Sequence, residues 1–315
     1  MKLTIGIPTY NRPDTVLKTI SKLISPTNSN QLNFLIIDNG SDTNIANYFH
    51  DKLPSLTNLS IKRFNTNLGF YESFYRLFDE CETEYLMTLS DEDYFDLDYL
   101  DEVLKVLNSE SPNLLVISAK NKSTFMQRKR TRKIPLYRLK DETSYISGLI
   151  YKTKPVKENI NFFRNLSKLE EFAFLYPAVL VAFALSLDGK CLSFKEPGIK
   201  IGDIVPTTVT SSRGRGYKLP TERVYQYISL LNCIHELRAN SPKHALKINL
   251  LQAYAKLNFH AVIYDSIGRI SVSAQADFVF SSSKTFLFVF LRKISGVFQF
   301  SVVSLFSMVS KWINK

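Results

Sequence analysis

Residues 85–93 read Tyr-Leu-Met-Thr-Leu-Ser-Asp-Glu-Asp, a short apolar stretch that runs directly into three acids. An apolar run of this length that ends in turn-forming residues predicts a buried strand. Two earlier stretches share this design, because residues 33–37 are followed by Asp-Asn-Gly-Ser and residues 3–7 by Pro-Thr-Tyr-Asn-Arg. In all three stretches the polar residues therefore follow the carboxyl end of a predicted strand.

Segments with helical spacing of apolar residues separate these strands. The spacing predicts helices over residues 14–24, 43–52, 69–81 and 97–107, and two further strands over residues 59–64 and 114–118. Strands that alternate with helices predict an α/β fold with a mostly parallel, doubly wound sheet. In such a sheet ligands bind beyond the carboxyl ends of the strands, which is where the three polar clusters lie.

The whole chain has the composition of a folded protein. Its 315 residues are 45% hydrophobic and 22% charged, which suits one large domain with a helical appendage and excludes global disorder or a polytopic membrane protein. Cys81, Cys191 and Cys233 lie far apart, as in proteins of a reducing compartment. Neither a secretory signal nor a good spanning helix is visible, so we predict a cytoplasmic protein.

Charge is divided unevenly along the chain. Residues 1–100 contain 8 Lys and Arg against 14 Asp and Glu, whereas residues 101–315 contain 32 against 15. The acidic front suits a cation, and the basic back suits an anionic ligand or surface. Residues 120–140 hold nine Lys and Arg and no acid, which indicates either a solvated loop or a surface for anionic lipid. Nucleic-acid binding is not supported, because the sequence contains no recognised module for it.

The last third of the sequence has a helical pattern from residue 221. Its tail, residues 284–315, spaces apolar residues helically around five Lys and Arg without an acid, which is typical of an amphipathic helix in a membrane interface. A helix that packs into the core or forms a dimer would give the same pattern, so a homo-oligomer stays open. Upstream, residues 172–187 predict one long buried helix. Arg213 and Arg215 lie in a basic loop that either covers a diphosphate or is simply exposed.

Common enzyme motifs are missing from the sequence. It contains neither GxGxxG nor GxxxxGK[ST], and the His-Glu pair at residues 235–236 lacks the second histidine of a zinc protease. The four histidines are scattered. These observations argue against a dinucleotide site, a P-loop and a zinc site.

Asp91, Glu92 and Asp93 form the sharpest cluster of chemistry-bearing residues. Between positions 77 and 104 the sequence has no Lys or Arg, so local cations do not neutralise the three acids. Mg²⁺ and Mn²⁺ prefer carboxylate oxygens, and Mg²⁺ sites commonly add substrate phosphates. The cluster is therefore either a metal site or a solvated acidic turn before a helix. The turn at residues 38–42 is likewise either part of a ligand site or a helix cap.

In their order and spacing, four stretches resemble the family 2 glycosyltransferases of GT-A fold. They are residues 7–12 (Ile-Pro-Thr-Tyr-Asn-Arg), 36–41 (Ile-Ile-Asp-Asn-Gly-Ser), 67–69 (Asn-Leu-Gly) and 89–93 (Leu-Ser-Asp-Glu-Asp). The likeness covers residues 1–120. It implies a Rossmann-like fold and inverting transfer of a sugar from a nucleotide-sugar, assisted by Mn²⁺ or Mg²⁺. The Asp-Asn-Gly-Ser form and the basic tail are more similar to bacterial O-antigen and capsule enzymes, such as abequosyltransferase-like proteins of lipopolysaccharide biosynthesis.

The resemblance also implies roles for particular residues. Donor-binding residues would be Pro8, Tyr10, Asn11, Asp38, Asn39 and Asp91, and metal ligands would come from Asp91, Asp93 and Glu92. The phosphate chemistry of arginine, and not the resemblance, adds Arg213 and Arg215 to the donor-binding candidates. Pro8 and Tyr10 would border the nucleobase. The carboxylate that takes the acceptor proton would be Glu171 or Glu170, although stabilisation of a helix N-terminus would explain both acids equally.

Asn39 departs from the pattern of the family, in which many members carry Asp at this position. A carboxylate only accepts hydrogen bonds, whereas an amide also donates. Cytosine N3 is an acceptor, so we expect Asn39 to relax or alter the choice of base and to tolerate a cytidine donor, while its amide oxygen is still able to accept from uracil or thymine.

These points predict a transferase domain over residues 1–220 and a helical region over residues 221–315. The transferase domain would divide into a nucleotide-binding half, residues 1–120, and an acceptor half, residues 121–220. The predicted acceptor is a glycan on a polyprenyl diphosphate at the inner face of the bacterial inner membrane, with the tail on the anionic lipid surface. A nucleotidyltransferase and a non-catalytic membrane-binding protein with a degenerate fold are the two rival interpretations.

Overall fold

The computed structural model describes residues 3–24, 31–50, 52, 57–119, 131–194, 196–202, 214 and 220–255. Contacts between residues divide the chain into two units. The first comprises Met1–Ile134, Leu139–Leu169 and Ala173–Thr207, and the second comprises Pro135–Arg138, Glu170–Phe172 and Thr208–Lys315. The predicted amphipathic tail, residues 284–315, lies outside the described residues.

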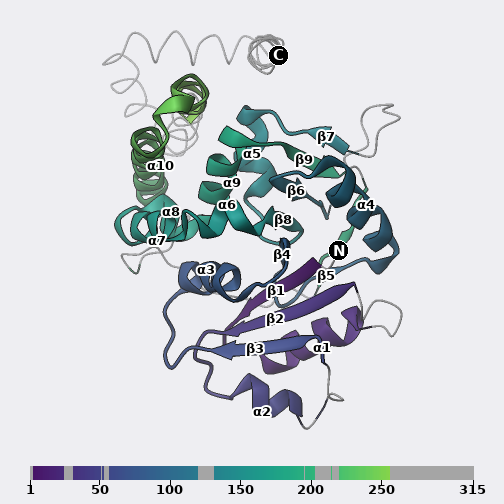
Figure 1. The fold of residues 1–315 in the computed structure, drawn as a ribbon. Coiled ribbons are helices and arrows are strands. Elements are labelled where there is room, and N and C mark those ends of the chain that lie inside the picture. Colours follow the sequence, from purple (N-terminus) through teal and green to yellow (C-terminus); the bar gives the residue numbers. More distant parts are fainter. Residues whose placement is uncertain are drawn as a thin grey trace, which may run out of the picture. The chain divides into compact units, whose positions relative to one another are not determined.

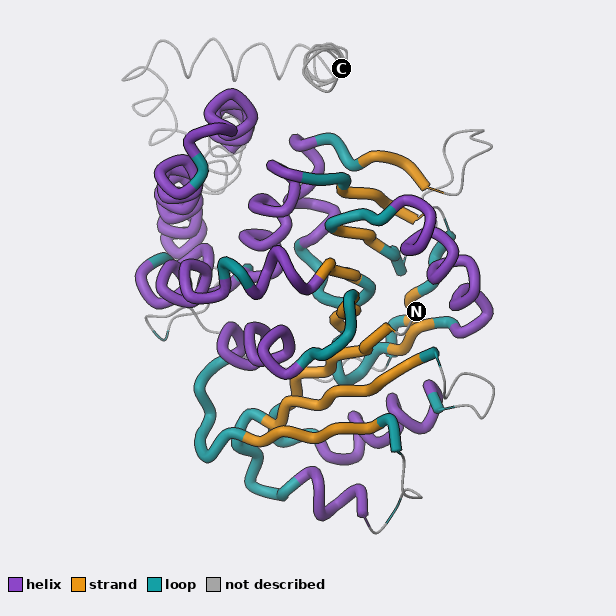
Figure 2. Tube along the Cα trace, in the orientation of Figure 1, coloured by secondary structure: helices purple, strands orange, loops and turns teal. Residues whose placement is uncertain are grey.

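The first unit is built on an eight-stranded sheet. In spatial order its strands are β3 (Leu59–Arg63), β2 (Leu32–Asp38), β1 (Leu3–Thr9), β4 (Tyr85–Thr88), β8 (Leu149–Lys152), β6 (Leu114–Val116), β9 (Cys191–Phe194) and β7 (Thr131–Lys133). The strands from β3 to β4 are parallel, with Thr9 opposite Asp38 and Gly6 opposite Thr88. Their carboxyl ends therefore meet at one edge of the sheet, whose strands run side by side in Figure 2.

The predicted parallel sheet is confirmed in β3-β2-β1-β4, and the remaining strands are mixed in direction. Strand β8 lies antiparallel between β4 and β6, β9 is parallel to β6, and β7 is antiparallel to β9. The direction of β8 follows from the position of the turn before it, because Ile146 and Ser147 already contact Thr88 and Ser90 at the carboxyl end of β4. A strand that begins at that edge has to run away from it.

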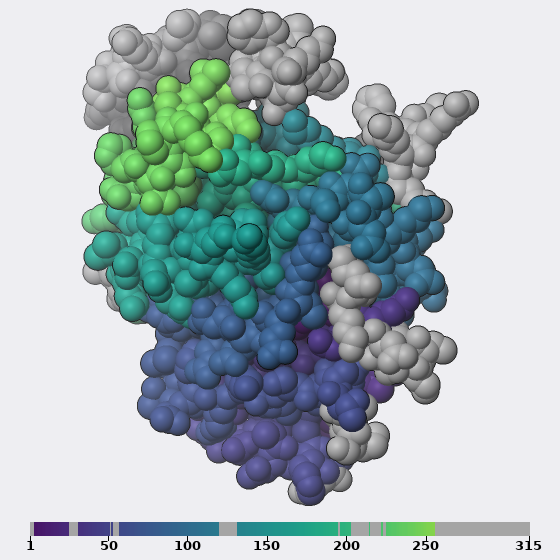
Figure 3. Space-filling view, viewed as in Figure 1, coloured from purple at the N-terminus to yellow at the C-terminus, as the bar shows by residue number. Residues whose placement is uncertain are grey.

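Helices cover both faces of this sheet (Figure 1). On one face lie α1 (Pro13–Leu23), α2 (Ile45–His50) and α4 (Leu100–Glu110), whose apolar residues join Leu3, Ile5 and Ile7 in one buried core. On the other face α3 (Phe70–Glu80) packs on β1 and β2, together with α6 (Thr153–Lys157), α7 (Ile160–Leu169) and α9 (Pro177–Asp188). The purple and blue atoms of the early part of the chain form one continuous mass in Figure 3.

Proline determines where two helices begin. Pro13 and Pro177 occupy the first position of α1 and α9, where the missing N–H costs nothing and the fixed φ suits a helix. The single helix predicted over residues 172–187 is consequently wrong. It is two helices, α8 (Glu171–Leu175) and α9, because a proline inside a helix removes a hydrogen bond and clashes with the preceding turn.

Two short strands and a basic run complete the first unit. Strands β5 (Tyr94–Phe95) and β10 (Ile199–Lys200) pair antiparallel, and the 3-10 turn η1 (Leu97–Tyr99) leads into α4. The part of the predicted basic loop that is described, residues 131–140, contains β7 and the start of α5 (Leu136–Thr143). Arg132 in this part pairs with the buried Glu142 at 2.9 Å, so it is not simply solvated.

The second unit is helical where it is described, as the sequence predicts. It contains α10 (Pro220–Asn240), a 3-10 turn η2 (Pro242–His244) and helical residues 245–255. Within this unit the backbone N–H of Phe172 donates to Ser229 Oγ at 2.8 Å. Across the described ranges of the chain, we find no helix with the length and hydropathy needed to span a membrane.

Candidate functional site

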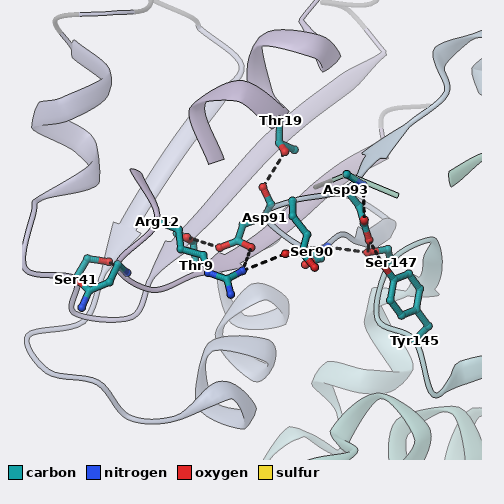
Figure 4. A network of polar contacts seen from close by, with 12 residues as sticks. Thr9, Arg12, Thr19, Ser41, Ser90, Asp91, Asp93, Tyr145 and Ser147 are labelled. Atoms are coloured by element: carbon teal, nitrogen blue, oxygen red, sulfur yellow. Dashed lines mark hydrogen bonds and ion pairs between the residues drawn. The ribbon is translucent and has the colours of Figure 1, made fainter. Parts of the chain in front are cut away.

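Asp91 lies just beyond the carboxyl end of β4 and is held by the end of β1. Its Oδ2 accepts a hydrogen bond from Thr9 Oγ1 at 2.8 Å, and its Oδ1 accepts one from Arg12 Nη1 at 3.0 Å (Figure 4). Its backbone carbonyl accepts from Thr19 Oγ1 of α1 at 2.7 Å. Only 5% of Asp91 is exposed. Two strand ends and one helix therefore fix the position of this carboxylate.

Arg12 gives the acidic cluster a cation that the sequence did not suggest. Its Nη1 lies 3.0 Å from Asp91 Oδ1 and 3.3 Å from Glu92 Oε2. The prediction that the acids lack a cationic partner is therefore wrong, because it considered only residues 77–104. Burial raises the pKa of Asp91 above its usual value, and the hydrogen bond from Thr9 and the charge of Arg12 oppose this only in part.

Asp93 is fully buried and faces away from Asp91, toward the turn before β8. Its Oδ2 accepts hydrogen bonds from the hydroxyls of Tyr145 and Ser147, and its Oδ1 accepts one from the backbone N–H of Gly202 at 3.2 Å. Ser147 Oγ also accepts from the backbone N–H of Ser90 at 2.9 Å. Asp93 thus ties together the ends of β4 and β10 and the turn that precedes β8 (Figure 4).

Two glycines make this close approach feasible. Gly148 has a φ of +84°, and a Cβ there would lie 2.3 Å from the carbonyl oxygen of Ile117. A Cβ on Gly202 would lie 1.8 Å from the carbonyl oxygen of Glu92. Ser147, which precedes Gly148 in this turn, donates its hydroxyl to Asp93, so the turn lies beside the acidic residues.

The turn after β2 is a second polar cluster, and its side chains are hydrogen-bonded to other residues of the protein. Asp38 Oδ2 accepts from Arg63 Nη1 of β3 at 2.5 Å, and Oδ1 accepts from the backbone N–H of Ser41 at 2.9 Å. The backbone N–H of Asn11 donates to Ser41 Oγ, and the Asn11 side chain pairs with Asp42. Asp38 and Asn11 therefore position the strand ends in this structure.

Asn39, 5% exposed, clamps the loop that precedes α3. Its Nδ2 donates to Asn67 Oδ1 at 2.9 Å and to the carbonyl oxygen of Gly69 at 3.2 Å, while its Oδ1 accepts from the backbone N–H of Leu68 at 3.0 Å. The two backbone contacts fix which end of the amide is oxygen. Both N–H hydrogens are then used within the protein, and what remains is one lone pair on Oδ1. In this conformation Asn39 offers a ligand an acceptor only.

The other predicted site residues fall into three groups. Pro8 lies within β1, and Tyr10 follows the strand with 41% of its surface exposed, so its ring is accessible. Glu170 and Glu171 belong to the second unit, where Glu170 Oε1 accepts from Asn232 Nδ2 at 3.0 Å and Glu171 begins α8. Arg213 and Arg215 lie outside the described residues.

The acids suit a divalent metal by their chemistry. Carboxylates are hard oxygen ligands with about four lone-pair sites each, and a Mg²⁺ site commonly uses one or two of them together with substrate phosphates. Among the described residues no three His, Cys, Asp or Glu side chains are arranged to hold an ion by themselves. Asp91 and Asp93 face different partners, which explains this. The carboxylates therefore fit a metal site in which a phosphorylated ligand supplies the remaining oxygen ligands. Which of the acids bind the metal stays a prediction.

Sequence reasoning missed four residues of this site: Arg12 and Arg63 as partners of the buried acids, and Tyr145 and Gly202 as partners of Asp93. Arg12 follows the end of β1, and Arg63 is the last residue of β3. Their position at strand ends was the signal in the sequence that could have identified them. Tyr145 and Gly202 are 52 and 109 residues from Asp93, and no local pattern in the sequence marks them as its partners.

Comparison with known proteins agrees with this geometry. A sequence model of the family described as Glycosyl transferase family 2 matches residues 4–172. Residues 1–349 of S. aureus TarS superpose with a TM-score of 0.59 at 14% identity, covering 93% of this chain and 82% of that one. The same part of TarS in complex with UDP-GlcNAc gives a TM-score of 0.55 at 15% identity, covering 92% and 82%. At this identity the likeness shows the fold, and no curated protein sequence matches the chain.

Proposed function

The chain belongs to glycosyl transferase family 2, whose members take a sugar from a nucleotide-sugar donor, and we propose that it transfers this sugar to a lipid-linked glycan. The observation that supports a donor site most directly is the meeting of three strand ends. One edge of the sheet holds Thr9 at the end of β1, Arg12 shortly after it, Asn39 after β2 and Asp91 after β4. In open α/β sheets this edge is where nucleotides bind.

The proposed reaction is a single displacement with inversion. The acceptor hydroxyl oxygen forms a bond to the anomeric carbon as the bond from that carbon to the diphosphate oxygen breaks. The nucleoside diphosphate leaves with the bonding electrons, and a carboxylate takes the hydroxyl proton. A divalent cation bound by Asp91, Asp93 or Glu92 would supply charge neutralisation for the leaving diphosphate.

Glu171 is the proposed proton acceptor, with its neighbour Glu170 as the alternative. Glu171 is the first residue of α8. Glu170 precedes this helix and accepts a hydrogen bond from Asn232. Replacing the true base by Gln is expected to abolish transfer while leaving nucleotide affinity unchanged. Comparing Glu171→Gln with Glu170→Gln therefore assigns the role, and equal activity of both variants would contradict it.

The remaining lone pair of Asn39 favours a base with an N3–H group. Uracil and thymine donate from N3, whereas cytosine N3 accepts. The expectation from sequence, that an amide at this position tolerates cytidine, required a free N–H, and both hydrogens of Asn39 are engaged. We therefore propose a uridine or thymidine donor. A larger thermal shift with CDP than with UDP would contradict this assignment.

The decisive experiment is a thermal-shift screen with UDP, GDP, CDP and dTDP, each with and without Mn²⁺. A ligand that binds only the folded state raises the unfolding midpoint. We expect a metal-dependent rise with a uracil or thymine nucleotide, and its loss in the double variant Asp91→Asn, Asp93→Asn. The exposed pair Asp101→Asn, Asp141→Asn is the matched control with the same change of charge.

Two outcomes would favour the rival interpretations. A protein that shows no shift with any nucleotide would be a non-catalytic member of the fold. Release of pyrophosphate, in place of a nucleoside diphosphate, would mark a nucleotidyltransferase. The proposed membrane location and polyprenyl-diphosphate acceptor rest on the basic tail, residues 284–315, and binding of the full chain to anionic vesicles tests them.

A further inference from the structure

Tyr145 is exposed and anchored at the same time. Of its surface 43% is accessible, yet its hydroxyl donates to the fully buried carboxylate of Asp93. A tyrosine has two side-chain torsions, and a bond at the tip of the ring restrains both of them. The exposed ring is therefore held in one orientation at the edge of the site (Figure 4).

The groups that hold Tyr145 are themselves fixed. Asp93 also accepts from Ser147 Oγ and from the backbone N–H of Gly202, and Ser147 is in turn bound to Ser90. Gly148 closes the turn with a φ of +84° against the carbonyl oxygen of Ile117. A side chain supported in this way is preorganised, so a ligand that packs on it does not have to order it first.

The surroundings of the ring combine an apolar surface with charge. Ile201 is 52% exposed and directly precedes Gly202, whose N–H binds Asp93. A second exposed apolar side chain therefore belongs to the neighbour of a residue that, like Tyr145, binds Asp93. Glu92, next to Asp93 in the chain, pairs with Arg12 at 3.3 Å and brings charge to this segment. An apolar platform beside a few polar groups is the usual composition of a small-ligand site.

We propose that the ring of Tyr145 is a platform on which a pyranose ring of the transfer reaction stacks, at a position fixed by its bond to Asp93. A pyranose presents C–H groups on one face, and these match the electron-rich face of an aromatic ring. Its hydroxyl edges suit the neighbouring acids and Arg12. The inference rests on the proposed function, and it adds a sugar-binding residue for either the donor or the acceptor.

Two substitutions separate the ring from its anchor. Tyr145→Phe keeps the ring and removes the bond to Asp93, whereas Tyr145→Leu removes both. Tyr225→Leu, at a tyrosine of α10 that is 49% exposed, is the matched control. Calorimetric titration with UDP and with UDP-N-acetylglucosamine measures the donor arm. Saturation-transfer NMR with a panel of methyl pyranosides measures the acceptor arm and does not require nucleotide binding.

The two arms give distinct results. Stacking on a donor sugar predicts that Tyr145→Leu weakens UDP-N-acetylglucosamine about fivefold, with UDP affinity unchanged and a smaller loss in Tyr145→Phe. Stacking on an acceptor sugar predicts that the Leu variant loses the pyranoside signal while both titrations are unchanged. The control variant should match the wild type in both arms.

Equal behaviour of wild type and Tyr145→Leu in both arms would overturn the platform. Failure of the proposed function looks different, because the wild type would then bind none of UDP, GDP, CDP and dTDP in the thermal-shift screen. The pyranoside signals of wild type and Tyr145→Leu would still decide the role of the ring in that case. Unchanged circular dichroism spectra of the variants show that they are folded.

Discussion

The β2 turn (residues 38–42) and the acidic segment (residues 90–93) have similar sequences but different surroundings. In the β2 turn, Asp38 is bound by Arg63 and by Ser41, both within 25 residues of it. In the acidic segment, Asp91 is bound by Thr9 and Arg12, and Asp93 by Tyr145, Ser147 and Gly202. The first is therefore a local scaffold, and the second joins parts of the chain from residue 9 to residue 202.

The largest expected effect comes from a substitution that removes the buried acceptor of the β2 turn. Asp38→Ala leaves Arg63 and the Ser41 N–H without their buried acceptor, which should lower the free energy of unfolding by about 2–3 kcal/mol. Urea denaturation followed by circular dichroism measures it. Asp42→Ala, at an exposed position of the same turn, should change stability by less than about 0.5 kcal/mol. Equal effects would show that the β2 turn is not a buried scaffold.

The next effect sharpens the role of the acidic segment. In Gly202→Ala the new Cβ would occupy the place of the Glu92 carbonyl oxygen, so the end of β10 has to move away from Asp93. We expect a loss of about 1–3 kcal/mol in unfolding free energy and weaker nucleotide binding. Ser21→Ala, at an exposed position of α1, is the control, because it adds no atom that could clash. Wild-type nucleotide affinity in Gly202→Ala would contradict the joining role.

A smaller effect is expected where the β2 turn clamps the loop before α3. Asn39→Asp removes the donors to Asn67 and Gly69 and puts a carboxylate beside two acceptors. Because the exposed Asn67 amide is able to rotate and donate, we expect a loss of only about 1 kcal/mol in the free energy of unfolding. Both forms should prefer UDP to CDP in the thermal-shift screen. A gain of CDP binding in wild type over the variant would restore the expectation from sequence.

The smallest effect concerns alkaline pH. Burial, and then the charge of Glu84, raises the pKa of Tyr85 to about 12. Below pH 10 both the folded and the unfolded states hold this proton, and between about 10 and 12 only the folded state does. Stability should therefore decrease as pH rises through this window. Urea denaturation at several pH values measures how steeply the free energy of unfolding falls with pH. Tyr85→Phe should make this slope shallower, and an unchanged slope in the variant would contradict the prediction.

The sequence predicted the elements of the first half of the sheet well because their causes are local. The apolar runs before residues 38 and 89 became β2 and β4, and Pro13 marked the start of α1. Beyond residue 120 the prediction was weaker. Pro177 divides the helix predicted over residues 172–187 into α8 and α9, and the direction of β8 depends on where its preceding turn lies in space.

For the candidate site, the sequence predicted where the polar clusters lie but not which residues they contact. Placing the polar clusters after strands was correct, because parallel strands bring their carboxyl ends to one edge. The expected free amide of Asn39 is instead engaged with Asn67 and Gly69. The acids thought to lack a cation are paired with Arg12. Each error concerns a hydrogen-bond partner on another strand or loop.

By itself the sequence determined that this chain forms an α/β sheet with acids and turn residues after its strands, and which family it resembles. Periodicity, turn chemistry and motif spacing act over a few residues, so they are readable without coordinates. Only the tertiary structure decided which oxygen faces which donor. Thr9 and Asp91 are 82 residues apart, and Gly202 and Asp93 are 109 apart. Those contacts exist because the order and direction of the strands bring distant turns together at the same edge.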